Sequence, residues 1–364
     1  MGKCEVVWLS GLYRLADAIR ERFFGETVTF SKNVFIPLVN LCRNRCAYCG
    51  FRKNPWDNDA KLLLPEEVKL LLRKGKDAGC SEALFTFGER PEEKYPSIRD
   101  KLNRLGYEST LDYLYDMCSE ALKLGLLPHS NPGVLHKKEV KMLKEVNASM
   151  GLMLENVSDR LCMDGGPHAC SPGKKPELRL KTLAYAGECK VPFTTGILVG
   201  IGETLDEIVA SLYAIKQIHE KYGHIQEVII QNFVPKPGTP MENHPPPTLN
   251  YYSTVVALAR VILPGDVSVQ VPPNLNLGNI GFLLSIGAND LGGISPITPD
   301  YINPSEAWPE IEEVKCLVSE MGRFLRERLP VYPKYLKEDD FLSEKVAEVA
   351  RILSDENGFR RSTS

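Results

Sequence analysis

The sequence predicts an α/β fold: a (βα) barrel of the TIM type, with a six-stranded core extended towards eight strands. Short apolar runs alternate with amphipathic helical patterns along most of the chain, which is typical of parallel strands joined by helices. Two irregular stretches rich in Pro and Gly, 164–176 and 235–247, each follow a predicted strand. Loops in that position form the active-site face of a barrel. A chain of 364 residues accommodates one such barrel with short extensions.

The expected elements follow in chain order. An amphipathic helix opens the chain, with Leu12, Ile19 and Phe23 on one stripe. The apolar runs expected as strands cover residues 34–39, 83–87, 127–130, 149–155, 194–199, 227–233 and 267–271, with a last one near 290–292. The expected helices cover about 110–124, 137–146, 177–190, 205–218, 250–263, 305–328 and 340–354.

These elements predict three parts of the chain. Residues 1–30 form an N-terminal helical segment that packs on the barrel, 31–330 form the barrel, and 331–364 form a C-terminal helical extension and tail. The helix that follows the fifth strand has the clearest start, because Thr204 and Glu207 make a capping box.

Composition excludes several classes of protein. With 43% apolar residues, 25% charged residues and a formal charge of −3, the chain is neither disordered nor suited to bind nucleic acid. No apolar run reaches the roughly 18 to 20 residues of a membrane span, and the start lacks a signal-peptide pattern. We therefore expect a cytoplasmic protein whose ten cysteines are reduced.

Three of those cysteines crowd into one polar loop directly after the first strand. The segment runs Cys42-Arg-Asn-Arg-Cys46-Ala-Tyr48-Cys49. Three thiolates from one short loop can hold three irons of a [4Fe–4S] cluster and leave the fourth iron open for chemistry. A structural zinc site would need a fourth protein ligand. A bacterial ferredoxin motif would have closer cysteine spacing and a fourth cysteine followed by Pro. Buried structural thiols would not lie in a polar loop that contains arginines.

The Cys-x3-Cys-x2-Cys spacing, with Tyr48 before the last cysteine, resembles the radical S-adenosylmethionine superfamily. This resemblance implies that the open iron binds the methionine moiety of S-adenosylmethionine. One electron from the cluster then yields a 5′-deoxyadenosyl radical, which abstracts hydrogen from the substrate. The rival classes are an iron–sulfur electron-transfer protein, which would supply a fourth protein ligand, and a dinucleotide fold, whose glycine order is not met.

Cofactor-binding positions are expected at the ends of later strands. By resemblance, Gly88 and Glu89 stand where the superfamily has a Gly-Gly-Glu-like motif that receives the ammonium group, with Phe87 in place of the first glycine. By the same resemblance, Arg179 is expected to bind the carboxylate, and Gly200 belongs to a fifth-strand motif beside the adenine. The remaining predicted cofactor-binding residues are Tyr48 in the cysteine loop, Ser130 at the end of the third strand, and Glu155 at the end of the fourth strand, for the ribose hydroxyls.

Four longer segments, which begin at Thr86, His129, His168 and Asn289, resemble the CofG family of 7,8-didemethyl-8-hydroxy-5-deazariboflavin synthases from about residue 30 to 330. The resemblance implies a carbon–nitrogen lyase of coenzyme F420 biosynthesis. Its substrate would be 5-amino-5-(4-hydroxybenzyl)-6-(D-ribitylimino)-5,6-dihydrouracil, made by a partner, CofH, and a reductant would supply electrons. The alternatives are a CofH-like or menaquinone-pathway enzyme.

Candidates for the groups that contact the substrate lie at the expected barrel mouth. We predict Asp290 and Asn289 as catalytic residues, because a carboxylate at the end of the last strand could hold a polar substrate group. Asn131, Gln231 and Asn232 are further candidates.

Overall fold

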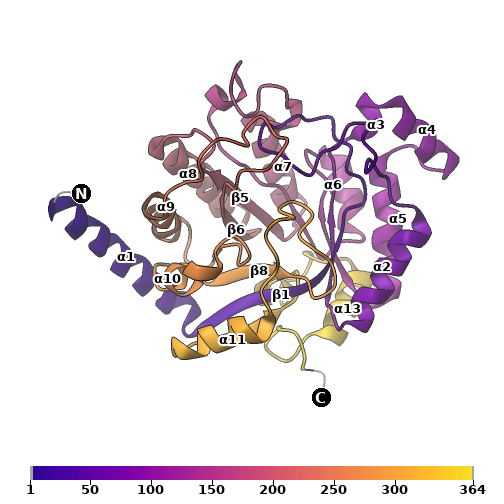
Figure 1. The fold of residues 1–364 in the computed structure, drawn as a ribbon. Coiled ribbons are helices and arrows are strands. Elements are labelled where there is room, and N and C mark those ends of the chain that lie inside the picture. Colours follow the sequence, from indigo (N-terminus) through magenta and orange to yellow (C-terminus); the bar gives the residue numbers. More distant parts are fainter. Residues whose placement is uncertain (1–2, 363–364) are drawn as a thin grey trace.

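The computed structural model describes residues 3–362 and the side chains of residues 8–362. Within them, eight parallel strands close into a barrel, because β1 pairs with both β8 and β2 (Figure 1). The strands are β1 (Thr27–Ile36), β2 (Glu82–Thr86), β3 (Leu127–Asn131), β4 (Ser149–Gly151), β5 (Phe193–Val199), β6 (Ile225–Asn232), β7 (Ser268–Gln270), β8 (Asp290–Ile294) and β9 (Phe324–Arg328). The predicted α/β barrel is confirmed, with the full eight strands.

Helices cover the outside of the barrel (Figure 1). The larger ones are α1 (Lys3–Phe24), α2 (Pro65–Asp77), α4 (Pro96–Arg104), α5 (Thr110–Lys123), α6 (Lys137–Lys144), α7 (Pro176–Glu188), α8 (Leu205–Tyr222), α9 (Leu249–Ile262), α11 (Ile311–Glu320) and α13 (Glu344–Leu353). Shorter pieces are α3 (Pro91–Lys94), α10 (Ile280–Leu284), α12 (Pro333–Leu336), η1 (Asp159–Cys162), η2 (Pro172–Lys174) and η3 (Leu277–Asn279). The first helix packs against α9.

The ends of α8 show how the local sequence sets an element. Thr204 Oγ1 accepts a hydrogen bond from the backbone N–H of Glu207, and the Glu207 carboxylate accepts one from the N–H of Thr204. At the other end Gly223 adopts a left-handed conformation, φ +67°, which suits glycine at a helix C-terminus. The predicted start of this helix is confirmed.

Several expected elements differ from the structure. The helix predicted over 305–328 is α11 alone, because Gly322 has φ +70° and turns the chain into β9. The first strand begins at Thr27, seven residues before the predicted start at 34, and so crosses the expected boundary at residue 30. The fourth strand ends at Gly151 rather than 155. The sequence patterns also missed α2, α3 and α4.

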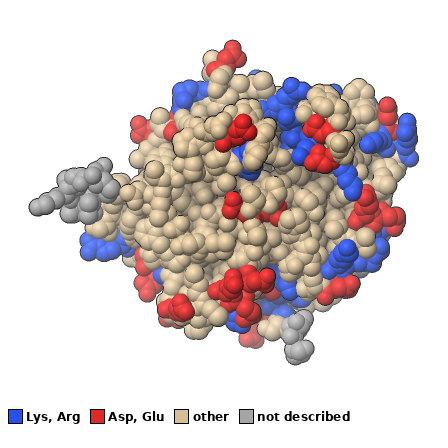
Figure 2. Space-filling view, in the orientation of Figure 1, with Lys and Arg blue, Asp and Glu red and all other residues tan. Residues whose placement is uncertain are grey.

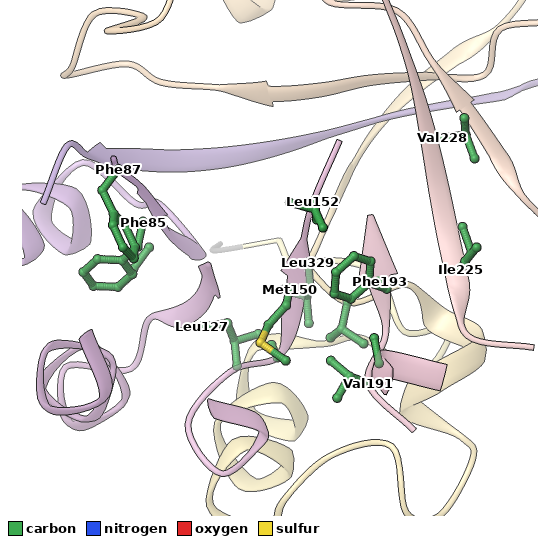
Figure 3. Packing of buried hydrophobic residues seen from close by; sticks show 14 of the residues in the cluster. Phe85, Phe87, Leu127, Met150, Leu152, Val191, Phe193, Ile225, Val228 and Leu329 are labelled. Carbon is green, nitrogen blue, oxygen red and sulfur yellow. The ribbon is translucent and has the colours of Figure 1, made fainter. Parts of the chain in front are cut away.

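The ninth strand closes the floor of the barrel. It pairs with the first half of β1, from Thr27 to Ser31, while β2 pairs with the second half. The chain then crosses the bottom, where the carbonyl of Pro330 accepts hydrogen bonds from Ser149 Oγ (2.7 Å) and Gln226 Nε2 (2.8 Å). Figure 3 shows Leu329 among Met150 and Phe193 of the barrel strands, in the main apolar cluster.

The face of the molecule drawn in Figure 2 carries charges of both signs. Figure 2 shows Lys and Arg side chains interspersed with Asp and Glu around the outline of this face. Among the described helices, none has the length and apolar character needed to cross a membrane.

Candidate active site

The cysteine loop is held by backbone hydrogen bonds from two sides. The N–H of Arg43 donates to the carbonyl of Glu89 (3.0 Å), beyond the end of β2. On the other side, the N–H groups of Arg45 and Ala47 donate to the carbonyls of Cys170 (3.1 Å) and Pro167 (2.8 Å). These hydrogen bonds fix the cysteine loop against the irregular stretch 164–176. That stretch lies at the active-site face, as predicted.

The sulfur atoms of Cys42 and Cys46 accept hydrogen bonds. The backbone N–H of Glu89 donates to Cys42 Sγ (3.2 Å), and Ser171 Oγ donates to Cys46 Sγ (3.3 Å). Cys42, Cys46 and Cys49 all line one cavity of about 380 Å³. Hydrogen bonds to the sulfurs are a known means of tuning iron–sulfur clusters.

This donor set fits a [4Fe–4S] cluster. Burial raises the pKa of the Cys42 thiol to about 12, so a thiolate at this position needs a cationic partner such as iron. Among residues 3–362 no three His, Cys, Asp or Glu side chains converge tightly enough to hold one metal ion. A cuboidal cluster instead takes thiolates spread around its corners.

Gly88 lets β2 approach the cysteine loop closely. Its N–H donates to the carbonyl of Val39 (2.8 Å), and a Cβ at this position would lie 1.8 Å from the carbonyl oxygen of Leu41. Only glycine allows that contact. The preceding Phe87 meets no such restriction and buries its ring beside the cavity, 7% exposed.

Glu89 lines the cavity next to the cysteines and is held from two directions. Its Oε1 accepts from Arg43 Nη2 (2.7 Å), and its Oε2 accepts from the backbone N–H of Val134 (3.1 Å). Gly133 and Gly173 leave the room that this side chain needs, since a Cβ on either would come within 2.4 Å of its atoms.

A second carboxylate, Glu155, follows β4 with a left-handed backbone, φ +65°. Lys174 Nζ donates to its Oε1, and Arg179 Nη2 lies 3.7 Å from the same atom. Burial raises the pKa of this carboxyl, but the two cations outweigh burial and leave the pKa below its usual value. A carboxylate ionised in this way can accept hydrogen bonds from hydroxyl groups.

Arg179 and Tyr48 complete this wall of the cavity. Arg179 Nε donates to the carbonyl of Met153 (2.6 Å) and its Nη1 to that of Gly173 (2.8 Å), so the guanidinium is fixed in place. The hydroxyl of Tyr48 hydrogen-bonds His168 Nε2 (3.0 Å). Burial, with Lys174 second, lowers the pKa of His168 to about 3, so its imidazole is neutral near pH 7.

The structure thus brings together most of the predicted site. Residues from distant parts of the chain line the same cavity: Cys42, Cys46, Tyr48, Cys49, Gly88, Glu89, Glu155 and Arg179. Asn131, Gln231 and Asn232 also lie in its wall.

Two predicted cofactor-binding residues do not reach the cavity. Ser130 lies between two cavity residues of β3, and because side chains alternate along a strand it points outward, where its Oγ donates to Asn147 Oδ1 (2.6 Å). Gly200 lies against Pro247, with φ +97° and its N–H donated to Glu203 Oε1 (2.8 Å). The cavity is lined instead by Leu198, two residues earlier.

The predicted position of Asn289 and Asp290 was wrong. They lie at the start of β8, at the opposite end of the barrel from the cysteines, and neither lines the cavity. Asn289 Oδ1 accepts from Arg260 Nη2 (2.5 Å) and from the N–H of Val269 (2.9 Å). Asp290 is fully buried and pairs with Arg328, Nε to Oδ2 at 2.7 Å. Both have the contacts of structural residues.

Sequence patterns missed several polar groups of the cavity. Some of these groups lie within strands and face the barrel interior. A polar residue within an apolar run was the sequence signal that could have identified them. Others come from loops or from β9. These residues are Asn33, Glu82, Lys174, Glu227, Lys236, Gln270 and Arg328.

Comparison with known proteins agrees with this geometry. A family model described as the radical SAM superfamily matches residues 36–213. A 7,8-didemethyl-8-hydroxy-5-deazariboflavin synthase of Methanopyrus kandleri is 56% identical over 92% of this chain and 100% of the relative. The chain belongs to the 7,8-didemethyl-8-hydroxy-5-deazariboflavin synthase family, within the radical SAM superfamily. Another member of this synthase family, from Methanocaldococcus jannaschii, is 53% identical over 90% of each chain.

Solved structures support the fold of the synthase family. Methylornithine synthase superposes with a TM-score of 0.67 at 21% identity, over 87% of this chain and 89% of that one. The [FeFe]-hydrogenase maturase HydG superposes with a TM-score of 0.72 at 17% identity, over 94% and 73%. The cofactors of this chain are those of the superfamily, a [4Fe–4S] cluster and S-adenosylmethionine.

Proposed function

We propose that the chain catalyses synthesis of 7,8-didemethyl-8-hydroxy-5-deazariboflavin in coenzyme F420 biosynthesis. Its substrate would be 5-amino-5-(4-hydroxybenzyl)-6-(D-ribitylimino)-5,6-dihydrouracil, and ammonia would leave during ring formation. The observation that carries the proposal is the 56% identity to such a synthase over that protein's whole length. The cavity adds support, because it runs from the cysteines to polar groups inside the barrel.

The residues divide into those that hold cofactors and those that face the substrate. Cys42, Cys46 and Cys49 would hold the cluster, which together with S-adenosylmethionine supplies a 5′-deoxyadenosyl radical when bound. Glu155 would accept hydrogen bonds from the ribose hydroxyls, and Arg179 suits the methionine carboxylate because a guanidinium can donate two parallel hydrogen bonds. Glu89 would receive the ammonium group.

His129 faces the cavity as a neutral imidazole. Its Nδ1 lies 2.6 Å from Ser149 Oγ, and that hydroxyl already donates to the carbonyl of Pro330. Ser149 must therefore accept from Nδ1–H, which leaves Nε2 unprotonated. Burial, with Arg328 second, lowers the pKa of His129 to about 4, so the ring stays neutral near pH 7.

The proposal includes partners and a location. CofH would supply the substrate, and a cellular reductant would supply the electron. The nine cysteines in the described side-chain range are all free, which suits the reducing cytoplasm.

One experiment tests the proposal. The cluster is reconstituted anaerobically, and dithionite, S-adenosylmethionine and the hydroxybenzyl adduct are added. We expect 5′-deoxyadenosine, ammonia and deazaflavin fluorescence together. Deoxyadenosine without deazaflavin would reject the proposed substrate, and turnover of tyrosine with 5-amino-6-(D-ribitylamino)uracil would instead indicate a CofH-like activity.

A further inference from the structure

The side chain of Asn33 has no hydrogen-bond partner. Asn33 lies in β1, is fully buried, and lines the cavity inside the barrel. Neither its Nδ2 nor its Oδ1 has a partner among residues 3–362. Buried amide groups are almost always hydrogen-bonded, because an unpaired one loses its interactions with water without replacement. An unpaired carboxamide that faces a cavity therefore points to a ligand.

A second carboxamide, Gln270 of β7, faces the same cavity beside a glycine pair in β8. A Cβ on Gly293 would lie 2.1 Å from Asn33 Nδ2, and a Cβ on Gly292 would lie 2.1 Å from Gln270 Nε2. Both glycines thus leave room for an amide nitrogen. Gly292 has φ +69°, and the register between β1 and β8 shifts here, with Thr29 opposite Asp290 but Ser31 opposite Gly293. Such irregularities re-aim neighbouring side chains and are frequent next to active sites.

Charged groups line the same cavity as the two carboxamides, namely Glu82, Glu227 and Arg328, which pairs with Glu227 at 3.0 Å. Asn33 pairs in register with Glu82 of β2, so their side chains are neighbours on the inner face, and Ser31 Oγ donates to Glu82. Glu227, which also lines the cavity, accepts from Thr194 Oγ1 (3.0 Å). TIM-barrel interiors are dominated by packed Val, Ile and Leu side chains. This polar interior suits a ligand with many hydrogen-bonding groups.

We propose that the carboxamides of Asn33 and Gln270 bind the pyrimidinedione ring of the substrate. This inference rests on the proposed function and adds the residues that recognise the ring. A pyrimidinedione edge alternates carbonyl acceptors with N–H donors, and each carboxamide offers one acceptor and a donating NH₂ group. Glu82, beside Asn33, accepts from hydroxyl or N–H groups that extend from the ring. Because the two glycines of β8 have no side chains, they leave room for both amide groups.

The test measures binding to the reconstituted holoenzyme, without turnover. The probe is 5-amino-6-(D-ribitylamino)uracil, with ribitol alone as the ring-free comparison, and isothermal titration calorimetry gives the affinity. We expect the probe to bind and ribitol to bind far more weakly. Asn33→Leu should weaken probe binding by about tenfold to a hundredfold, because the ring loses its partners in a buried site. Gln270→Met should act in the same direction.

A stability measurement separates recognition from folding. Asn33→Leu removes no hydrogen bond within the protein, so its melting temperature should equal or exceed that of the native chain. The matched control is Thr195→Val, whose hydroxyl donates to the carbonyl of Leu152 (2.8 Å) rather than lining the cavity. It should lower the melting temperature and leave probe binding unchanged.

Unchanged probe affinity in both Asn33→Leu and Gln270→Met would overturn the inference, as would equal affinity for ribitol and the probe. Failure of the proposed function gives a different result, since native enzyme would then make no deazaflavin from the adduct whatever its affinity for the probe. If Asn33→Leu does not fold, Gly293→Ala provides the second variant. Its Cβ should displace the Asn33 amide and weaken probe binding.

Discussion

Two networks of buried charge lie at opposite ends of the barrel. Their carboxylates differ in whether an oxygen atom remains available to a ligand. At the floor, Asp290 accepts from Arg328, from the hydroxyl of Tyr332 (2.9 Å) and from the N–H of Gly292 (2.6 Å), and both of its oxygens are used. At the rim, Glu155 contacts Lys174 and Arg179 through Oε1 and borders the cavity.

Contact with the cavity separates the functional carboxylate from the structural one. Both carboxylates are buried and both have a lowered pKa, with burial opposed chiefly by Arg328 at the floor and by Lys174 at the rim. Perturbed ionisation therefore does not distinguish them. Access does, because the rim carboxylate lines the cavity, whereas the floor carboxylate is fully buried and does not line it.

The largest effect is expected at the rim, from Cys46→Ala. Loss of one thiolate should prevent stable cluster assembly, so iron content and 5′-deoxyadenosine formation should fall to background. Iron analysis and chromatography of the reaction products measure this. The matched control is Cys118→Ala, since Cys118 is also buried but lies next to Ser130 and Asn147, outside the cavity. Normal turnover by Cys46→Ala would contradict the assigned ligand set.

At the floor, Asp290→Ala should unfold the protein more readily. Removing this carboxylate leaves the buried guanidinium of Arg328 without its main partner, and breaking such a pair costs about 3–5 kcal/mol. Urea denaturation measures the loss. Asp340→Asn, which breaks only an exposed pair with Lys190, should cost at most about 1 kcal/mol. A stable but inactive Asp290→Ala would restore the catalytic role predicted from sequence.

A smaller effect is expected from Glu155→Gln at the rim. The fold should persist, and the affinity for S-adenosylmethionine should fall by about tenfold to a hundredfold, because hydrogen bonds to a charged acceptor are lost. Equilibrium dialysis with the reconstituted protein gives the dissociation constant. Glu177→Gln serves as control, as Glu177 lies at the start of α7 and pairs with the exposed Lys181. Equal affinities for S-adenosylmethionine in the two variants would contradict the assignment of Glu155 to the cofactor site.

A further effect concerns the pH dependence of stability. Burial raises the pKa of Glu227 to about 8 despite the nearby Arg328, so the folded state holds a proton that the unfolded chain releases above about pH 4.5. The associated stability is complete below that pH and is lost as the pH rises through about 8. Native protein should therefore unfold at a lower urea concentration at pH 8.5 than at pH 6. Glu227→Gln should flatten this dependence, and an unchanged slope would contradict it.

Local signals in the sequence predicted much of the fold and part of the site. The alternation of apolar runs predicted a barrel, and the spacing of Cys42, Cys46 and Cys49 predicted their shared role, because neighbours in one short loop must lie close together. Resemblance to the superfamily motif predicted Glu89, and the end of the fourth predicted strand pointed to Glu155, since the ends of parallel strands meet at one face. The short strand β9 was missed, because Gly322 divides a stretch whose composition favours a helix.

Local patterns along the chain were enough to predict the fold class, the cysteine loop and the order of the eight barrel strands, because each depends on spacing over a few residues. Which side chains enter the cavity depends on the tertiary structure. Ser130 points outward while its neighbours His129 and Asn131 point inward, and Asp290 begins its strand instead of ending it. The physical reason is that strand register and boundaries are set by pairing with distant strands, and a shift of one residue exchanges the two faces.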